Sequence, residues 1–241
     1  VHTTAGVAAI VIAIVLGKRD SFSKNQLTPP HSPVLSMIGA SMLWVGWFGF
    51  NGGSALAADL TASKAILVTH IAASLGAFSW IIIEWLRFGK PSLVGMITGM
   101  VAGLATITPA SGFVGVEGGI ILGLLGGIIC YIGVELIRIR LKIDDSLDVF
   151  AVHGIGGMLG TILCGYLISK SFGGVGFDES LSAFDHIKIQ AYSVFATLVW
   201  TAIVTYLILK LISFFTSLRV SEDDERTGLD TSSHGESGYN L

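Results

Sequence analysis

Charged side chains are scarce in this sequence. Of its 241 residues, 13% are Asp, Glu, Lys or Arg and 52% are hydrophobic, whereas soluble domains carry roughly 25% charge. The mean hydropathy is +0.75, and long uncharged runs recur along the chain. These features indicate a protein whose solvent is lipid. The net charge of -3 provides no strongly basic surface, so nucleic acid is not an expected partner.

Cysteine and recognisable metal motifs are also nearly absent. The two cysteines, Cys130 and Cys164, lie inside apolar runs, and neither Cys-x-x-Cys nor His-Glu-x-x-His occurs. Small core residues are therefore the favoured interpretation, and no cofactor is expected. The chain begins with Val inside an apolar run and lacks the basic segment and cleavage site of a signal peptide. We therefore expect an upstream part of the protein before Val1.

The long apolar runs predict several membrane-spanning helices. A spanning helix needs about 20 largely apolar residues, and we predict spans over 1–17 (truncated at its N-terminus), 34–58, 64–86, 92–109, 117–138, 149–170 and 189–218. The fold class is thus an all-α polytopic membrane protein, with a transmembrane domain over 1–218 and a tail over 219–241. Many of the 31 glycines fall inside the spans, where small residues let helices approach closely.

Lysine and arginine predict the orientation of these helices. Of the 14 basic residues, Lys64, Lys170 and Lys188 fall at one end of the predicted spans and the other eleven at the opposite end. Because cytoplasmic loops carry the positive excess, the C-terminus is predicted to be cytoplasmic. The tail is too acidic to bind anionic lipid. A solvated end and a regulatory segment are both open interpretations of it.

A short motif, Val-His-x-x-x-Gly, occurs at Val1 and again at Val152. Five spans separate the start of one helix from the start of the other, so the two helices are predicted to run in opposite directions. This is typical of an inverted repeat with its functional site at the midplane. Ionisable residues inside spans usually face a cavity or each other. We therefore predict that His2 and His153 pair, with one ring donating to the other. A metal site is less favoured because no third ligand is in place.

The segment 44–54 carries four aromatic residues among glycines. A packed core or an interfacial belt would explain them. However, Leu43, Trp47, Phe50 and Ser54 follow one another at helical steps of three or four, and therefore share one face. Aromatic faces attract small cations by about 0.5–2 kcal/mol, and a serine hydroxyl accepts a hydrogen bond from an ammonium donor. This face predicts a site that collects a cation weakly.

Four stretches of sequence resemble the Amt/Mep/Rh ammonium transporter family, most closely its bacterial Amt branch. They are Gly46–Ala55, Ile107–Gly112, Asp148–Gly154 and the tail segment Gly228–Glu236, and they occur in the family's order. The resemblance implies a transporter and not an enzyme. It also implies a homotrimer of about eleven-helix protomers, each built from inverted five-helix repeats around its own pore. This chain would supply about the last seven helices.

The resemblance also implies roles for individual residues. His2 and His153 would be the twin histidines of the pore, Phe50 one of two stacked gate residues, and Ser54 part of the outer ammonium-recruitment site. Leu43, Trp47 and Thr108 would line or flank the pore, and Asp145 and Asp148 match acidic positions at the inner end of the histidine helix.

The expected function is nitrogen uptake as ammonium, which is recruited outside, deprotonated and passed as ammonia through the apolar pore. The main alternative is an ammonium sensor or transceptor that signals through the tail. The tail resembles the family segment that interacts with PII-type regulatory proteins, which makes such a protein an expected partner. A membrane enzyme or metal transporter using the two histidines, and transport of another small neutral solute, are further alternatives.

Overall fold

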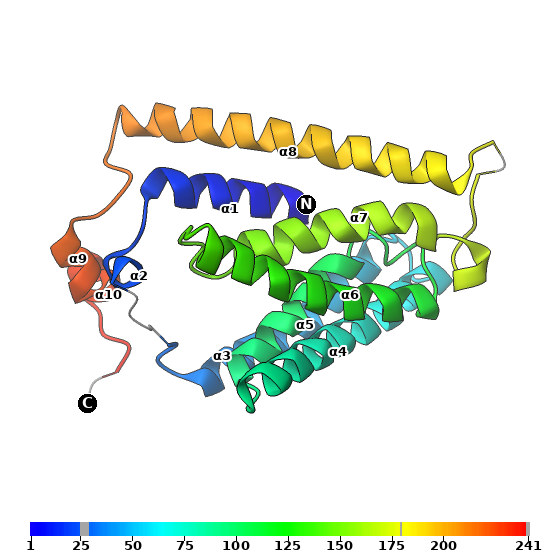
Figure 1. Cartoon of the computed structure of the whole chain (residues 1–241), viewed down its shortest axis with the longest axis horizontal. Coiled ribbons are helices and arrows are strands. Elements are labelled where there is room, and N and C mark those ends of the chain that lie inside the picture. Colours follow the sequence, from blue (N-terminus) through cyan, green and yellow to red (C-terminus); the bar gives the residue numbers. More distant parts are fainter. Residues whose placement is uncertain (25–28, 179, 240–241) are drawn as a thin grey trace.

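The computed structural model describes residues 1–24, 29–178 and 180–239, which are helical apart from connecting turns and loops (Figure 1). Within these residues, five helical stretches are long and apolar enough to cross a membrane. They are α3 (Pro33–Gly53), α4 (Leu60–Phe88), Val116–Arg140, Phe150–Leu167 and α8 (Ala183–Ser213). Two shorter apolar helices are α1 (His2–Leu16) and α5 (Leu93–Ile107). Together these correspond to the seven predicted spans.

Several predicted span boundaries were wrong, and helix caps, which hydropathy does not register, set the actual starts of α4 and α8. The span predicted over 34–58 ends at Gly53, and α4 starts afresh after Asp59, whose side chain accepts a hydrogen bond from the Ala62 N–H. The span predicted over 189–218 begins at Ala183 and ends at Ser213. Its early start follows from a capping box between Ser182 and Asp185, which satisfies free N–H groups of the first turn.

Two of the spanning stretches change helix type along their length. Helix α6 (Val116–Val134) continues as the π-helical segment η1 (Glu135–Arg140). Helix α7 (Gly156–Leu167) is preceded by the π-helical segment η2 (Phe150–Ile155), which contains His153. π-Helical turns are rare and occur frequently at functional sites. The π-helical turn therefore contains His153, the histidine of the second Val-His-x-x-x-Gly motif.

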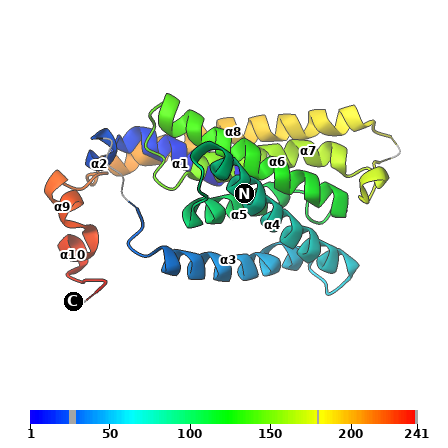
Figure 2. The same ribbon diagram turned by 60° about the horizontal axis from the view of Figure 1, so that its bottom comes forward.

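Helices α4, α5 and α6 form the centre of the molecule, with α3 and α8 on opposite sides of it (Figures 1 and 2). Their contact relies on glycine: a Cβ placed on Gly103 would lie 2.1 Å from the Ala72 carbonyl oxygen. Helix α3 is joined to α4 by a buried hydrogen bond of 2.8 Å from Asn51 Nδ2 to Thr69 Oγ1. Close packing of small residues is how helices associate in lipid.

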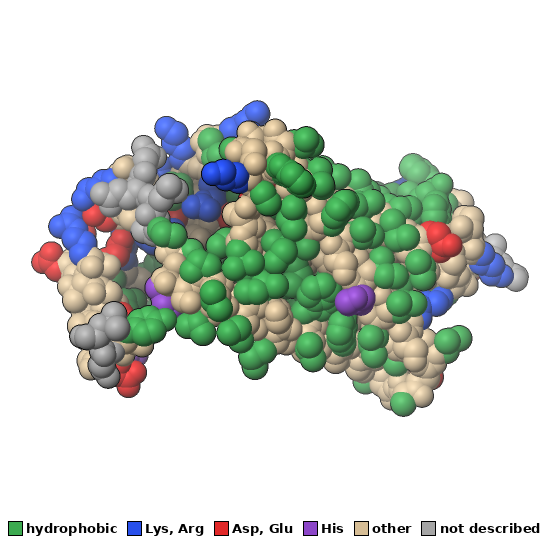
Figure 3. All heavy atoms as spheres, turned by 90° about the horizontal axis from the view of Figure 1, so that it is seen from below, with side chains coloured by type: hydrophobic (Ala, Val, Ile, Leu, Met, Phe, Trp, Pro, Cys, Tyr) green, Lys and Arg blue, Asp and Glu red, His purple; other side chains and the backbone are tan. Residues whose placement is uncertain are grey.

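Charge is concentrated at the two ends of the helices. Hydrophobic side chains cover much of the middle of the face shown in Figure 3. One end, called the basic end below, holds the last residue of α1, the start of η2 and three short helices, α2 (Asp20–Ser23), α9 (Glu222–Thr227) and α10 (Leu229–His234) (Figure 1). The opposite end, called the Ser54 end, holds η3 (Lys170–Phe172) and the start of α8.

Candidate functional site

The two predicted histidines lie side by side in the middle of the molecule. Their ring centroids are 5.4 Å apart and their planes differ by 8°. His2 is buried in the first turn of α1, and His153 is half-buried in η2. The structure thus brings together two residues that are far apart in the sequence. The hydrogen bond between the rings stays a prediction.

Glycines explain why the two rings can meet. A Cβ on Gly6 would lie 2.3 Å from the Gly154 Cα, and a Cβ on Gly157 would lie 2.8 Å from the His2 Cβ. The helices therefore cross in backbone contact and run in opposite directions. Gly6 and Gly157 are the terminal glycines of the two Val-His-x-x-x-Gly motifs. Each motif's glycine makes room for the other motif's histidine segment.

Aromatic residues of α3 enclose His2. The Trp47 ring lies nearly parallel to the His2 ring at 5.2 Å, and the Phe50 ring meets it edge-on at 6.0 Å. Trp47 Nε1 donates a hydrogen bond of 2.9 Å to Thr108 Oγ1. Three of the residues predicted to line or gate a pore therefore gather with the histidine pair. The result is a cluster of aromatic rings around His2, with threonines such as Thr3 and Thr108 beside it.

Ser54 and Leu43, at the two ends of the predicted aromatic face, lie outside this cluster. Ser54 is exposed at the end of α3, where its hydroxyl donates to the Phe50 carbonyl oxygen at 2.7 Å. Leu43 is 46% exposed on α3, one turn before Trp47. Both share a helix face with Trp47 and Phe50, as the spacing predicts. They extend the aromatic face toward the two ends of the helix.

The other aromatic residues of the segment face away from the histidine pair. Trp44 and Phe48 contact the exposed ring of His70 on α4, at centroid distances of 5.2 and 5.9 Å. The aromatic segment therefore has two faces, one toward His2 and one toward His70. His70 packs against aromatic rings, which leaves it apart from the proposed pore.

The two predicted acidic residues lie at the basic end, at the start of the His153 helix. Asp145 caps this helix: its carboxylate accepts hydrogen bonds from Val149 N at 2.9 Å and from Phe150 N at 2.7 Å. Asp148 has a φ of 56°. Burial raises the pKa of Asp148 to about 6, although the Arg138 guanidinium at 3.5 Å opposes the shift. Neither carboxylate contacts the ring cluster.

Sequence reasoning missed the neighbouring carboxylate, Asp144. It accepts hydrogen bonds of 2.9 Å from Arg19 N and Nε and of 2.7 Å from Arg19 Nη2. Burial alone would raise the pKa of Asp144, but its hydrogen bonds with Arg19 hold that pKa below the ordinary value. The only sequence signal was the Asp-Asp pair itself, because nothing local indicates a partner 125 residues away.

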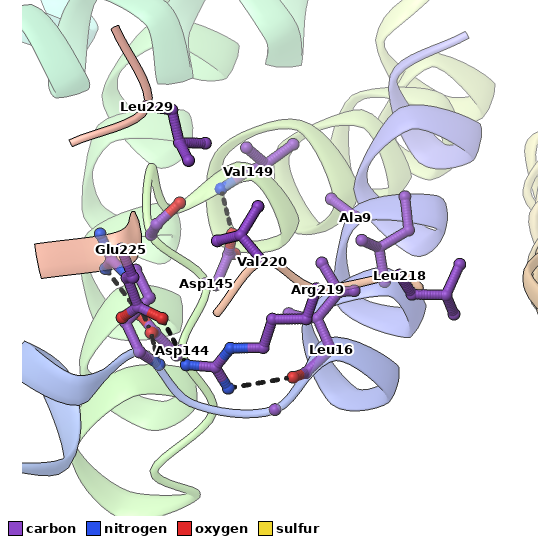
Figure 4. Close-up of a pocket in the computed structure, with 15 residues that line it drawn as sticks. Ala9, Leu16, Asp144, Asp145, Val149, Leu218, Arg219, Val220, Glu225 and Leu229 are labelled. Carbon is purple, nitrogen blue, oxygen red and sulfur yellow. Dashed lines mark hydrogen bonds and ion pairs between the residues drawn. The ribbon is translucent and has the colours of Figure 1, made fainter. Parts of the chain in front are cut away.

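A pocket of about 490 Å³ opens beside this ion pair at the basic end (Figure 4). Its walls come from α1, the loop before η2 and the tail, and it contains two ion pairs, Arg19–Asp144 and Arg219–Glu225. Across the residues that the structure describes, no group of three or more His, Cys, Asp or Glu side chains is placed to hold a metal ion.

Known proteins resemble this chain over nearly its whole length. It is 43% identical to the ammonium transporter Amt1 of Archaeoglobus fulgidus over 240 residues, which cover 99% of the chain and 60% of that protein. It is 42% identical to the ammonium transporter of Bacillus subtilis, covering 99% of the chain and 59% of that protein. Archaeal and bacterial relatives are thus similarly close, and the predicted bacterial branch is not resolved.

Solved structures show the same fold. A protein described as a sensor Amt protein superimposes with a TM-score of 0.86 and 31% identity, covering 97% of this chain and 58% of that one. Mep2 of Saccharomyces cerevisiae superimposes with a TM-score of 0.80 and 34% identity, covering 93% of this chain and 53% of that one. The predicted fold class is confirmed. The chain spans 60% or less of the length of these relatives.

The profile of the Ammonium Transporter Family matches residues 1–239. This match and the relatives above confirm the family predicted from the motifs, which is one of transporters and not of enzymes. With its membrane-length helices, its paired histidines and this match over nearly its full length, the chain belongs to the Ammonium Transporter Family.

Proposed function

We propose that this chain forms part of a pore that carries ammonium nitrogen across the cell membrane. The observation that carries the proposal is the His2–His153 pair, held at 5.4 Å by a glycine crossing and enclosed by Trp47 and Phe50. Ionisable side chains at membrane depth usually mark a solute or proton pathway. Family membership supports ammonium as the solute.

The chemistry of the site favours passage of neutral ammonia. An unpaired ion in an apolar medium costs tens of kcal/mol by Born estimates, and potassium, which resembles ammonium in size, has no proton to release. Ammonium can lose one. In the proposed path, ammonium is recruited near Ser54, gives up its proton near Phe50 to water of the outer mouth and passes His2 and His153 as ammonia. The imidazole nitrogens offer hydrogen bonds along an otherwise apolar stretch.

Two substitutions on α3 test the two ends of this path. Ser54→Leu deletes a hydroxyl and adds bulk at the mouth, so we expect a higher apparent KM for methylammonium uptake. Phe50→Ala removes a ring that contacts His2 and widens the constriction, so we expect altered selectivity or throughput. Uptake is measured in an ammonium-transport-deficient strain or in reconstituted vesicles.

Matched controls exist on α3 and α4. Ser41 is exposed on α3 and, like Ser54, donates to a carbonyl four residues earlier, so Ser41→Leu controls for added bulk. Phe78 is 56% exposed on α4, so Phe78→Ala controls for the loss of an exposed ring. If each test variant behaved like its control, α3 would face a packed interior rather than a pore.

We further propose that the basic end faces the cytoplasm and that the protein assembles as a homotrimer. The orientation is supported by the basic residues at that end. The trimer is proposed by family resemblance, with one pore in each protomer. In this orientation, recruitment occurs at the outer, Ser54 end, and ammonia leaves near the tail.

A second candidate function is ammonium sensing through the tail. It is favoured by the superposition on the sensor Amt protein and by contacts of the tail with the transmembrane region. Glu225 accepts a hydrogen bond of 2.8 Å from Asp20 N, and Arg226 pairs with the Asp20 carboxylate at 3.3 Å. The tail is therefore docked beside α2, where a change in its position can reach α1.

Deleting residues 221–241 separates these possibilities. The segment buries little apolar surface, so we expect membrane insertion to be kept. We expect uptake regulation or coupling between subunits to change, because the Glu225 and Arg226 contacts are lost. Uptake and binding of a PII-type protein are measured together. Wild-type uptake combined with retained PII binding would mean that the tail is only a solvated end.

A further inference from the structure

The contact between α1 and the His153 helix only weakly constrains the position of α1 along its own axis. At the crossing, Gly6 meets the Gly154 backbone and Gly157 meets the His2 backbone. Glycines allow close approach, but they supply no side-chain knob that fits a hole on the partner and fixes axial register. A shift of α1 along its own axis would move His2 relative to His153. Another contact must therefore fix that register.

The basic end supplies such a contact. Arg19 follows α1 by three residues and makes its three hydrogen bonds to Asp144, whose side chain is 1% exposed. The adjacent Asp145 caps the His153 helix through Val149 N and Phe150 N. The end of the His2 helix is thus tied to the start of the His153 helix through two neighbouring carboxylates, by hydrogen bonds of 2.7–2.9 Å.

The tail holds the same junction from its other side (Figure 4). Arg219 Nη1 donates to the Leu16 carbonyl oxygen at 3.3 Å, at the last residue of α1. Glu225 joins Arg219 Nη2 to Asp20 N with hydrogen bonds of 2.6 and 2.8 Å. The end of α1 is therefore fixed by groups from two other parts of the chain. An ion pair with a buried member and a bidentate arginine is geometrically specific.

We propose that the Arg19–Asp144 ion pair is a positioning element that sets the axial register of α1 against the His153 helix, and thereby the placement of His2 beside His153. Its effect on transport rests on the proposed function, whereas its effect on the ring pair does not. Asp144 and Arg19 touch no solute. They act through the two helices that carry the rings.

The test combines variants of this ion pair with a matched control. Asp144→Asn removes one charge at nearly constant volume, Arg19→Gln removes the other with a shorter side chain, and the double variant can restore a neutral amide pair. Arg19→Lys keeps the charge but loses the bidentate fork, so its cross peak and its uptake should lie between those of the wild type and Arg19→Gln. It keeps the proposal testable if the stronger variants misfold. Glu135→Gln breaks the ion pair with Arg87 at the same end, which joins α4 to η1 and not the histidine helices.

The direct readout is a through-space cross peak between the two imidazoles in histidine-labelled protein in lipid bilayers, measured by solid-state NMR and assigned by its loss in His153→Gln. We expect Asp144→Asn and Arg19→Gln to weaken this peak and to lower maximal methylammonium uptake about tenfold, since misplacement by about 1 Å can cost up to 100-fold. The apparent KM should stay within about twofold, because the outer mouth is untouched.

The double variant should lose no more cross-peak intensity or uptake than the worse single variant, because both single changes remove the same interaction. An unchanged cross peak in Asp144→Asn and Arg19→Gln, or equal weakening in Glu135→Gln, would overturn the proposal. If the wild-type protein failed to carry methylammonium while the cross peak still depended on Arg19 and Asp144, the proposed function would fall and the positioning role would stand.

Discussion

His153→Ala is expected to abolish methylammonium uptake while leaving the protein inserted in the membrane and folded. The substitution removes a half-buried ring whose neighbour, His2, lies 5.4 Å away. It leaves the Gly6–Gly154 crossing in place, because that contact is made by backbone atoms. The loss should therefore fall on the polar lining of the pore rather than on helix packing. Uptake and the yield of folded protein after detergent extraction are measured in parallel.

His70→Ala is the matched control for this experiment. His70 also lies within a predicted span, but its ring contacts Trp44 and Phe48 instead of the histidine pair. We expect His70→Ala to keep most of the uptake. A properly inserted His153→Ala protein with normal uptake would remove the proposed pore role of the twin histidines.

Gly6→Ala is expected to destabilise the protein and to lower uptake. The added Cβ would lie 2.3 Å from both the Cα and the N of Gly154, where only backbone could move away. Overpacking of this kind typically costs about 1–3 kcal/mol, and each kcal/mol shifts the melting temperature of a protein of this size by roughly 2–4 °C. Because separating α1 from η2 also separates the rings, uptake should fall as well.

Gly46→Ala, on α3, is expected to raise the melting temperature instead. A Cβ on Gly46 of α3 meets nothing within 4 Å, and replacing a helical glycine by alanine gains up to about 1 kcal/mol in helix propensity. Thermal unfolding of both variants in detergent compares the two effects directly. A rise in melting temperature for Gly6→Ala similar to that for Gly46→Ala would contradict the backbone crossing.

The helices themselves were predictable because lipid imposes a simple requirement. A segment that crosses the hydrocarbon must be long, apolar and internally hydrogen-bonded, and all seven predicted spans have a helical counterpart. The helix starts at Leu60 and Ala183 were not predictable from hydropathy, because they depend on capping by Asp59 and Ser182. The family was also predictable, because its motifs occur in the same order along this chain.

The histidine pair was predictable only in part. The repeated Val-His-x-x-x-Gly motif pointed to His2 and His153, and helical spacing placed Trp47 and Phe50 on one face. The sequence did not show that the motif's own glycines form the contact between α1 and the His153 helix. Nor did it show that Trp47 donates a hydrogen bond to Thr108. Those contacts depend on which helices pack together, and the local sequence pattern does not indicate which helices these are.

By itself, the sequence determined which segments are long and apolar enough to cross a membrane, which family the chain belongs to and which residues are candidates for the site, because these follow from composition, period and motif. Only the tertiary structure decided that Gly6 meets Gly154 and that Asp144 meets Arg19, the latter across 125 residues of chain. The physical reason is that side-chain period along one helix says which face is buried. It does not say which helix covers that face, at what axial register, or which distant charge completes an ion pair.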